Sequence, residues 1–185
     1  MRIRFTRFLL FACLQSVIGV AQSQPVLKLP GPPAQELLLG TWSIRVQYLA
    51  TQDSPTTESG SGEEKWYPGP GGFSLVEEYR EHSSKGDIEG LGVLWWDKSV
   101  AGLRVLWCEN DEPSGCALMI GIGHWESDQL ILTSDQELHG KKLKFKEVFS
   151  EITATSFQQT LYSGEGASEL KAVVIISATR KSAFP

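Results

Sequence analysis

From residue 41 onward, apolar and polar residues alternate along the chain with a period of two. The clearest stretch covers residues 41–48, in which every second residue is apolar: Trp42, Ile44, Val46 and Tyr48. Because successive side chains of a strand point to opposite faces, this alternation is typical of a strand with one buried face. We therefore predict that the fold opens with a β-strand here.

Further segments of strand-like composition follow at short spacing. They cover residues 63–67, 73–82, 88–97, 103–108, 116–125, 129–134, 142–150, 156–162 and 170–179. Clusters of Gly, Ser, Asp and Pro separate most of them, as tight reversals between antiparallel neighbours require. We predict an all-β, antiparallel up-and-down barrel of about ten strands, since closure removes the exposed edges of so large a sheet. An open sandwich is the alternative.

Two segments outside this pattern have different compositions. Residues 34–39 are helix-forming and lie between Pro33 and Gly40, which predicts a short helix that closes one barrel end. Residues 51–62 are polar and rich in Ser and Gly, which predicts an exposed loop.

The N-terminus has the pattern of a secretory signal peptide. Three arginines among the first seven residues precede a mostly apolar stretch over residues 8–20, and small residues follow. We expect a signal peptide at 1–23, a proline-rich leader at 24–33 and a single barrel domain at 34–181. The protein is then secreted or periplasmic. No membrane span is expected, because the apolar stretch is shorter than the ~20 residues that a spanning helix needs.

Cys13 and the residues before it resemble a lipoprotein signal only loosely, because the bulky Phe11 occupies a position where a small residue is required. Lipid anchoring is therefore not expected.

Charge narrows the choice of partners. Without residues 1–23 the chain keeps fourteen basic and twenty-two acidic residues, a net charge of −8. So acidic a chain has no electrostatic attraction to nucleic acid or anionic lipid. Oligomeric state is not indicated.

Cys108 and Cys116 are the two cysteines beyond the signal, and they flank seven turn-like residues. In an exported protein such a pair predicts a disulfide, which would stabilise the hairpin by about 2 to 3 kcal/mol. The Cys-x-x-Cys spacing of redox-active thiols is absent.

Several segments carry a resemblance to a known fold family. Gly40-Thr41-Trp42 matches the Gly-x-Trp that opens the first strand of lipocalins and other calycins, where the Trp packs across one barrel end. With residues 71–79, 89–97, 151–157 and 178–181, the chain resembles a bacterial family of small, often exported single-domain proteins of uncharacterised function. The resemblance implies a lipocalin-like, calycin-like β-barrel and supplies no catalytic residue.

The Gly-x-Trp opening is also similar to that of nitrobindin-like haem barrels. The chain departs from that family because Ser43-Ile44-Arg45 replaces its glycine-rich continuation and the last strand has no histidine. We therefore expect no haem, and no other cofactor is indicated.

Two acids fall on apolar strand faces. Glu77 shares a face with Leu75 and Tyr79, and Glu147 shares one with Phe145 and Phe149. If these faces line the interior, burial should raise the pKa of both carboxyl groups, as happens at many functional sites. The alternative is that each lies near a barrel mouth or pairs with an arginine such as Arg45 or Arg104.

Aromatic residues supply candidate walls for a ligand. The proposed ligand-binding set is Trp42, Glu77, Tyr79, Trp96, Phe145 and Glu147. On the strand of Trp96, Gly90 and Gly92 would allow bending or leave room beside a ligand. Simple core filling is the alternative use of the aromatic rings.

No specific catalytic or metal motif occurs. His82, His124 and His139 lie on separate segments without the spacing of a zinc site. Strand alternation places His124 on the face of Leu118, Ile120 and Ile122, which looks inward. Pairing of Cys108 with Cys116 would put Leu106 on the same inward face and turn Trp107 away from it. The inward orientation of His124 and the burial of Trp107 therefore exclude each other.

Three functions remain. The first is an exported, non-enzymatic barrel that binds a small apolar or amphipathic molecule. The second is a barrel enzyme in which Glu77 and Glu147 converge and perform acid or base chemistry. The third is a protein-interaction module with a filled interior.

Overall fold

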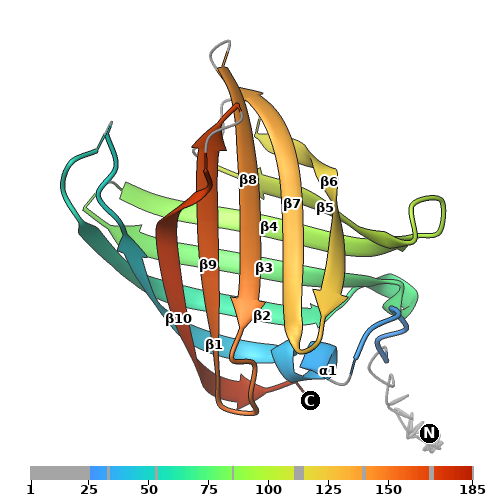
Figure 1. Cartoon of the computed structure of the whole chain (residues 1–185). Coiled ribbons are helices and arrows are strands. Elements are labelled where there is room, and N and C mark those ends of the chain that lie inside the picture. The colour runs from blue at the N-terminus through green and yellow to red at the C-terminus, as the bar shows by residue number, and fades with distance from the viewer. Residues whose placement is uncertain are drawn as a thin grey trace, which may run out of the picture.

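The computed structural model describes residues 26–32, 34–52, 54–84, 86–110, 115–138, 141–166 and 169–184. It confirms the predicted all-β architecture with one short α-helix (Figure 1). The elements are α1 (Ala34–Leu38), β1 (Gly40–Tyr48), β2 (Glu58–Pro68), a 3-10 turn (Pro70–Gly72), β3 (Ser74–Ser83), β4 (Gly86–Asp97), β5 (Gly102–Glu109), β6 (Cys116–Glu126), β7 (Gln129–Leu138), β8 (Lys141–Ser150), β9 (Ser156–Glu165) and β10 (Lys171–Ala183).

The ten strands form one closed up-and-down barrel. Each strand pairs antiparallel with its neighbours in sequence, and β1 closes the ring on β10 from Gly40 opposite Ala183 to Tyr48 opposite Val174. Every strand thus has a partner on both sides, which is why the barrel has no free sheet edge. The calycin-like architecture follows from this topology.

Strand β2 begins earlier than its sequence indicates. Residues 58–62 pair with β1 and residues 60–62 pair also with β3, although we expected a loop over 51–62. A Cβ atom at Gly62 would lie 1.8 Å from the carbonyl oxygen of Arg80, and one at Gly60 would lie 2.0 Å from the Glu81 carboxyl. These glycines permit close packing against β3. Because Gly is also typical of turns, the composition of this segment predicts a loop although the segment is a strand.

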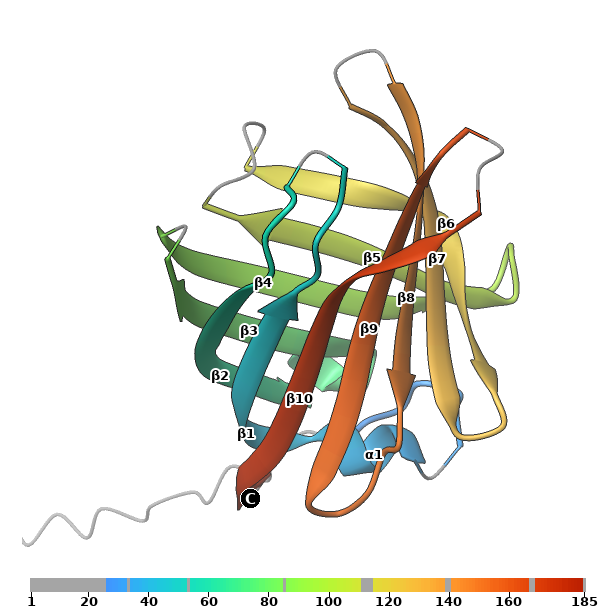
Figure 2. The ribbon, with the colours of Figure 1, turned by 60° about the vertical axis from the view of Figure 1, so that its left-hand side comes forward.

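Helix α1 lies across one end of the barrel, which we call the α1 end (Figure 2). Trp42 donates a hydrogen bond from Nε1 to the carbonyl oxygen of Leu38 at 2.7 Å. Arg180 donates to the carbonyl oxygens of Leu37 and Leu39, and its guanidinium lies 4.0 Å from the centre of the Trp42 ring. The helix therefore closes this end, as predicted.

Exposure of the inward-facing side chains rises from the α1 end to the opposite end, which we call the far end. Toward the α1 end the side chains are fully buried, among them Trp42, Ile44, Trp66, Phe149 and Phe157. Toward the far end Glu81 is still buried, but the other large inner side chains are half-buried: Tyr48, Trp107, Phe145, Leu161 and Val174. The barrel is thus packed at one end and accessible at the other.

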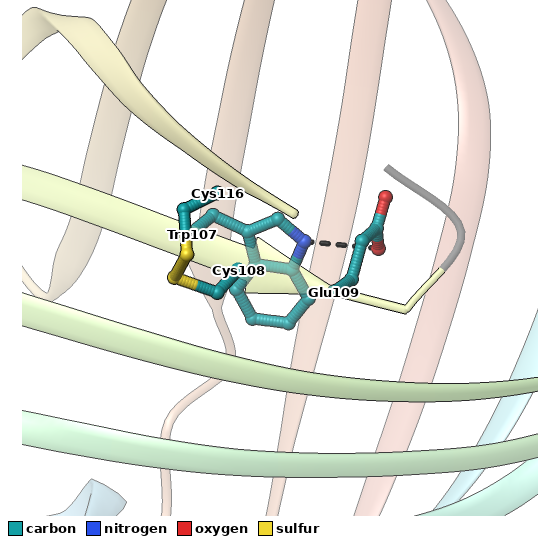
Figure 3. The surroundings of a disulfide bond; sticks show 4 residues. All are labelled: Trp107, Cys108, Glu109 and Cys116. Carbon is teal, nitrogen blue, oxygen red and sulfur yellow. Dashed lines mark hydrogen bonds between the residues drawn. A yellow bond between two sulfur atoms is a disulfide. The ribbon is translucent and has the colours of Figure 1, made fainter. Parts of the chain in front are cut away.

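The predicted disulfide between Cys108 and Cys116 is present and joins β5 to β6 near the far end (Figure 3). Alternation on β5 turns Trp107 inward, onto the face of the buried Val105 and Leu103. On β6, His124 and Ile122 are exposed, so the interpretation of that face as inward is wrong for these two residues. Leu103 pairs with Gly123 and Val105 with Met119, so the register shift between β5 and β6 adds two residues to β6 and keeps the alternation of faces. The orientation set by the disulfide therefore holds along both strands, with Trp107 inside and His124 outside.

None of the helices in the described part of the chain is long and apolar enough to cross a membrane.

Candidate functional site

Three glutamates form a polar layer inside the barrel, between the aromatic core and the far end. Glu64 on β2 is 0% exposed, and Glu77 on β3 is 5% exposed. Glu147 on β8 is surrounded by protein but keeps some accessible surface, which faces the interior because Phe149 shares its side of the strand. We call Glu64, Glu77 and Glu147 the glutamate layer.

Burial dominates the electrostatics of this layer. It raises the pKa of Glu64 to about 8 and the pKa of Glu147 to about 7. It also raises the pKa of Glu77 well above the ordinary value, and the charges of Glu64 and Glu147 raise it further. The Trp66 and Phe149 rings, two residues nearer the α1 end on β2 and β8, meet with centroids 5.6 Å apart, and Glu77 pairs with Trp66. The three carboxyl groups therefore face one region of the interior.

Several polar atoms in this region have no hydrogen-bond partner in the described structure. Oε2 of Glu64 accepts from Nε1 of Trp66 at 3.1 Å, and Glu147 accepts from Nε2 of Gln159. Glu64 Oε1, Gln159 Oε1 and Ser134 Oγ are buried without a partner. A buried polar atom without a partner costs about 1–3 kcal/mol, so these atoms mark a place where a ligand would recover free energy.

A second polar cluster lies nearer the far end. The Tyr48 hydroxyl donates to the Glu81 carboxyl at 2.8 Å, and the Tyr79 hydroxyl donates to it at 2.6 Å. Burial and the hydrogen bonds to Glu81 raise the pKa of both tyrosines. Both hydroxyls therefore stay protonated and hold Glu81 in place.

Trp107 fills the wall between these two clusters. Its Nε1 donates to Glu109 at 2.9 Å (Figure 3), and its ring meets Tyr79 edge to face with centroids 5.9 Å apart. A Cβ atom at Gly90 would lie 2.5 Å from the Trp107 ring, and one at Gly92 would lie 2.9 Å from the Glu77 carboxyl. The room left by these glycines is therefore occupied by Trp107 and Glu77.

The residues proposed from the sequence divide into two groups. Glu77, Tyr79 and Glu147 line the middle of the barrel, with Phe145 two residues from Glu147 on the same face and half-buried toward the far end. Trp42 lies at the α1 end, and so does Trp96, which pairs with Leu103 beside the β4–β5 turn and packs against the core. The structure thus brings the two predicted acids together and places these two tryptophans below them.

The acids are not paired with the arginines that we considered. Arg104 bonds to Asp97 at 3.2 Å, and Arg45 is exposed.

Reading the sequence missed Glu64, Glu81, Trp107 and Gln159. Glu64 alternates with Trp66, and Glu81 continues the face of Glu77 and Tyr79, so extending the alternation by one position would have found both acids. Trp107 was missed because the disulfide and the apolar face gave opposite orientations.

The two histidines that the structure describes, His82 and His124, lie outside the interior. His82 is exposed and contacts Asp87 at 2.8 Å, while His124 lies 3.7 Å from Glu126 with its side chain 48% exposed. His139 is outside the described residues. Within the described residues, no three His, Cys, Asp or Glu side chains are arranged to hold a metal ion.

Comparison with known proteins gives structural likeness alone. No family model matches the chain, and no curated protein matches it. A de novo designed fluorescence-activating β-barrel matches with a TM-score of 0.43 at 14% identity, covering 82% of this chain and 100% of its own. The S-type phycobiliprotein lyase CPES from Guillardia theta matches with a TM-score of 0.49 at 10% identity, covering 81% and 89%. A redesigned barrel, mFAP0, solved with DFHBI, matches with a TM-score of 0.40 at 15% identity, covering 78% and 99%.

Proposed function

We propose that the barrel binds one small, partly apolar molecule in its interior, entering from the far end. The observation that carries this proposal is the set of unpartnered buried polar atoms, on Glu64, Ser134 and Gln159, beneath half-buried apolar side chains. Apolar walls with a few convergent polar groups are the usual composition of a small-molecule site.

The site residues have different parts in this proposal. Tyr79 and Phe145 are walls, to which the structure adds Trp107, and Glu77 and Glu147 are polar anchors, to which it adds Glu64. Trp42 and Trp96 support the floor, because they pack at the α1 end below the glutamate layer.

Titration with the neutral fluorophore N-phenylnaphthylamine tests the proposal. We expect saturable fluorescence enhancement with one probe per protein. Leu161→Trp, on the inner face toward the far end, should lower the affinity at least about tenfold by narrowing the entrance. Tyr162→Trp, the next residue on the outer face of the same strand, is the matched control and should bind as the wild type does. Absence of saturable binding, or equal binding by both variants, would support a filled interior and the interaction-module alternative.

A second candidate function is acid or base catalysis. It is favoured by the glutamate layer, in which burial raises the pKa of Glu147 to about 7 and that of Glu64 to about 8, close to the values at which a carboxyl group exchanges protons near neutral pH. Native mass spectrometry of protein from its own host, with chemical identification of any co-purifying molecule before and after incubation, distinguishes the two functions. An unchanged molecule supports binding, and a converted one supports catalysis.

We propose further that the protein is exported and belongs to the bacterial family that it resembles. The signal-like residues 1–23 and the disulfide support export, since disulfides persist in oxidising compartments. N-terminal sequencing of the mature protein tests this, with cleavage expected after Ala21 or Ser23. An N-terminus that retains the arginine-rich segment would contradict it.

A further inference from the structure

We propose that the molecule bound inside the barrel carries a cationic nitrogen, such as a primary ammonium group, which is held among Glu64, Glu77 and Glu147. This inference rests on the proposed binding function and names the chemical class of its ligand.

The first argument is the sign of charge on the inner face. The acids on the inner face include Glu64, Glu77, Glu81, Glu109 and Glu147, and Glu58 shares this face at the far end of β2. Among the side chains that the structure describes, the lysines and arginines lie on the outer surface apart from Arg180, which is bound to backbone carbonyl groups at the α1 end. The interior therefore offers an excess of negative groups and no cation of its own near the glutamate layer.

The second argument is the inventory of donors and acceptors. Gln159 uses its Nε2 to donate to Glu147, which leaves its carbonyl Oε1 buried and unpartnered, and Glu64 likewise leaves Oε1 unpartnered. An amide carbonyl and an ionised carboxylate are acceptors only. An ammonium group has three N–H donors and no acceptor, so it supplies the hydrogen-bond donors that the glutamate layer lacks.

The third argument is electrostatic. Burial raises the pKa of all three carboxyl groups, and the charge of Glu147 raises the pKa of both Glu64 and Glu77 further, so a cation among them stabilises their charged forms and displaces protons. Glu81, Glu109, Tyr48 and Tyr79 face the same interior from neighbouring strands: the acids would add attraction, and the tyrosines stay neutral because burial raises the pKa of both. A ligand with an anionic head would meet repulsion from the same groups.

The shape of the site favours an organic cation with an apolar body. In the part of the chain that the structure describes, no three His, Cys, Asp or Glu side chains are arranged to hold a metal ion, so an organic cation suits the layer better than a bare metal ion. The Tyr79 and Trp107 rings, 5.9 Å apart between centroids, supply aromatic surface next to the layer. Aromatic rings attract cations and also pack well against an aromatic ligand body.

Three probes with the same apolar body and different head groups test this inference: naphthylethylamine, naphthylethanol and naphthylpropanoate. Calorimetric titration near neutral pH, in phosphate and in Tris, gives both the affinity and the number of protons released. We expect the amine to bind at least about tenfold tighter than the alcohol, to release protons, and to exceed the propanoate by more. Its ammonium group stays charged, because amines of this kind have a pKa near ~10.

Glu→Gln variants, each of which removes one carboxyl group, distinguish the effect of the inner face from that of the outer face. Glu77→Gln should bring the affinity of the amine close to that of the alcohol and leave alcohol binding unchanged, and Glu147→Gln should act in the same direction. Glu78→Gln, the neighbouring position on the outer face where Glu78 accepts from the Tyr67 hydroxyl, should retain the full preference.

Each outcome of the titration is decisive. If the alcohol binds and the amine binds no better, or if Glu77→Gln keeps the preference, the cation inference is wrong while the binding function stands. If none of the three probes binds, the binding function itself fails.

Discussion

At the scale of single residues, the glutamate layer is the most informative feature of this protein. Glu64, Glu77 and Glu147 occupy positions where leucine or valine would pack without electrostatic cost, and burial raises the pKa of each. A barrel stabilised by packing alone would not need them. They are therefore best explained by what the interior binds.

Glu147 makes the stability of the unliganded protein depend on pH. In the folded protein its pKa is raised from 4.5 to about 7, so between these values the folded state holds a proton that the unfolded state has lost. Stability from this group is complete below the unfolded pKa and is lost as pH rises through the folded one, about 3 kcal/mol in all. Glu147→Gln should remove that part of the slope, measured by urea unfolding from about pH 5 to about pH 9. Glu78→Gln should keep the wild-type slope, and an unchanged slope in Glu147→Gln would contradict the assigned burial.

At the scale of elements, β2 shows how packing defines a strand that hydrophobic periodicity does not mark. Its first five residues, 58–62, have no large apolar side chain, yet all five pair with β1 and residues 60–62 pair also with β3. Their contribution is close packing against β3, because Gly62 lets the two backbones approach and Gly60 leaves room for the Glu81 carboxyl group.

Gly62→Ala should destabilise the barrel by at least about 2 kcal/mol, the range of a substitution that forces backbone displacement. The reason is that the new Cβ would lie 1.8 Å from the Arg80 carbonyl oxygen, which belongs to the backbone and cannot move alone. Thermal unfolding compared with Ser61→Ala, an exposed neighbour, checks this. Equal stability of the two variants would show that β2 and β3 are not packed this closely.

The disulfide acts on the β5–β6 hairpin. Replacing Cys108 and Cys116 with serine should lower the free energy of unfolding by about 2 to 3 kcal/mol, through the greater entropy of the unfolded chain. Reduced wild-type protein should match the double variant in urea unfolding. A reduced protein as stable as the oxidised one would indicate that the hairpin needs no covalent link.

The sequence was sufficient for the barrel, and for Glu77 and Glu147 inside it, because both depend on period-two alternation within one strand. It was insufficient for the orientation of β5 and β6, because both faces of these strands carry apolar residues and alternation alone does not say which face is buried. The convergence of Glu64, Glu77 and Glu147 depends on the relative positions of β2, β3 and β8 around the barrel, which no local pattern encodes.

At the scale of the whole molecule, the two barrel ends have different roles. The α1 end is sealed by α1, the Trp42 ring and Arg180, whereas inner side chains toward the far end retain accessible surface. This asymmetry assigns stability to one end and ligand entry to the other.

Arg180→Met should cost about 2 to 4 kcal/mol of stability, because it removes charged hydrogen bonds to the carbonyl oxygens of Leu37 and Leu39 and the contact with the Trp42 ring. Lys181→Met removes only an exposed ion pair with Glu63 and should cost less than about 1 kcal/mol. Urea unfolding of both variants measures the difference. A loss for Arg180→Met no larger than that for Lys181→Met would mean that the α1 end is not held by this arginine.

A crystal structure determined in the presence of naphthylethylamine tests the central claim most directly. The account predicts that the naphthyl group lies inside the barrel near Tyr79 and Trp107, with the amine nitrogen within hydrogen-bond distance of carboxyl oxygens of the glutamate layer. A barrel interior filled by its own side chains, with the amine bound to the outer surface or absent, would contradict it.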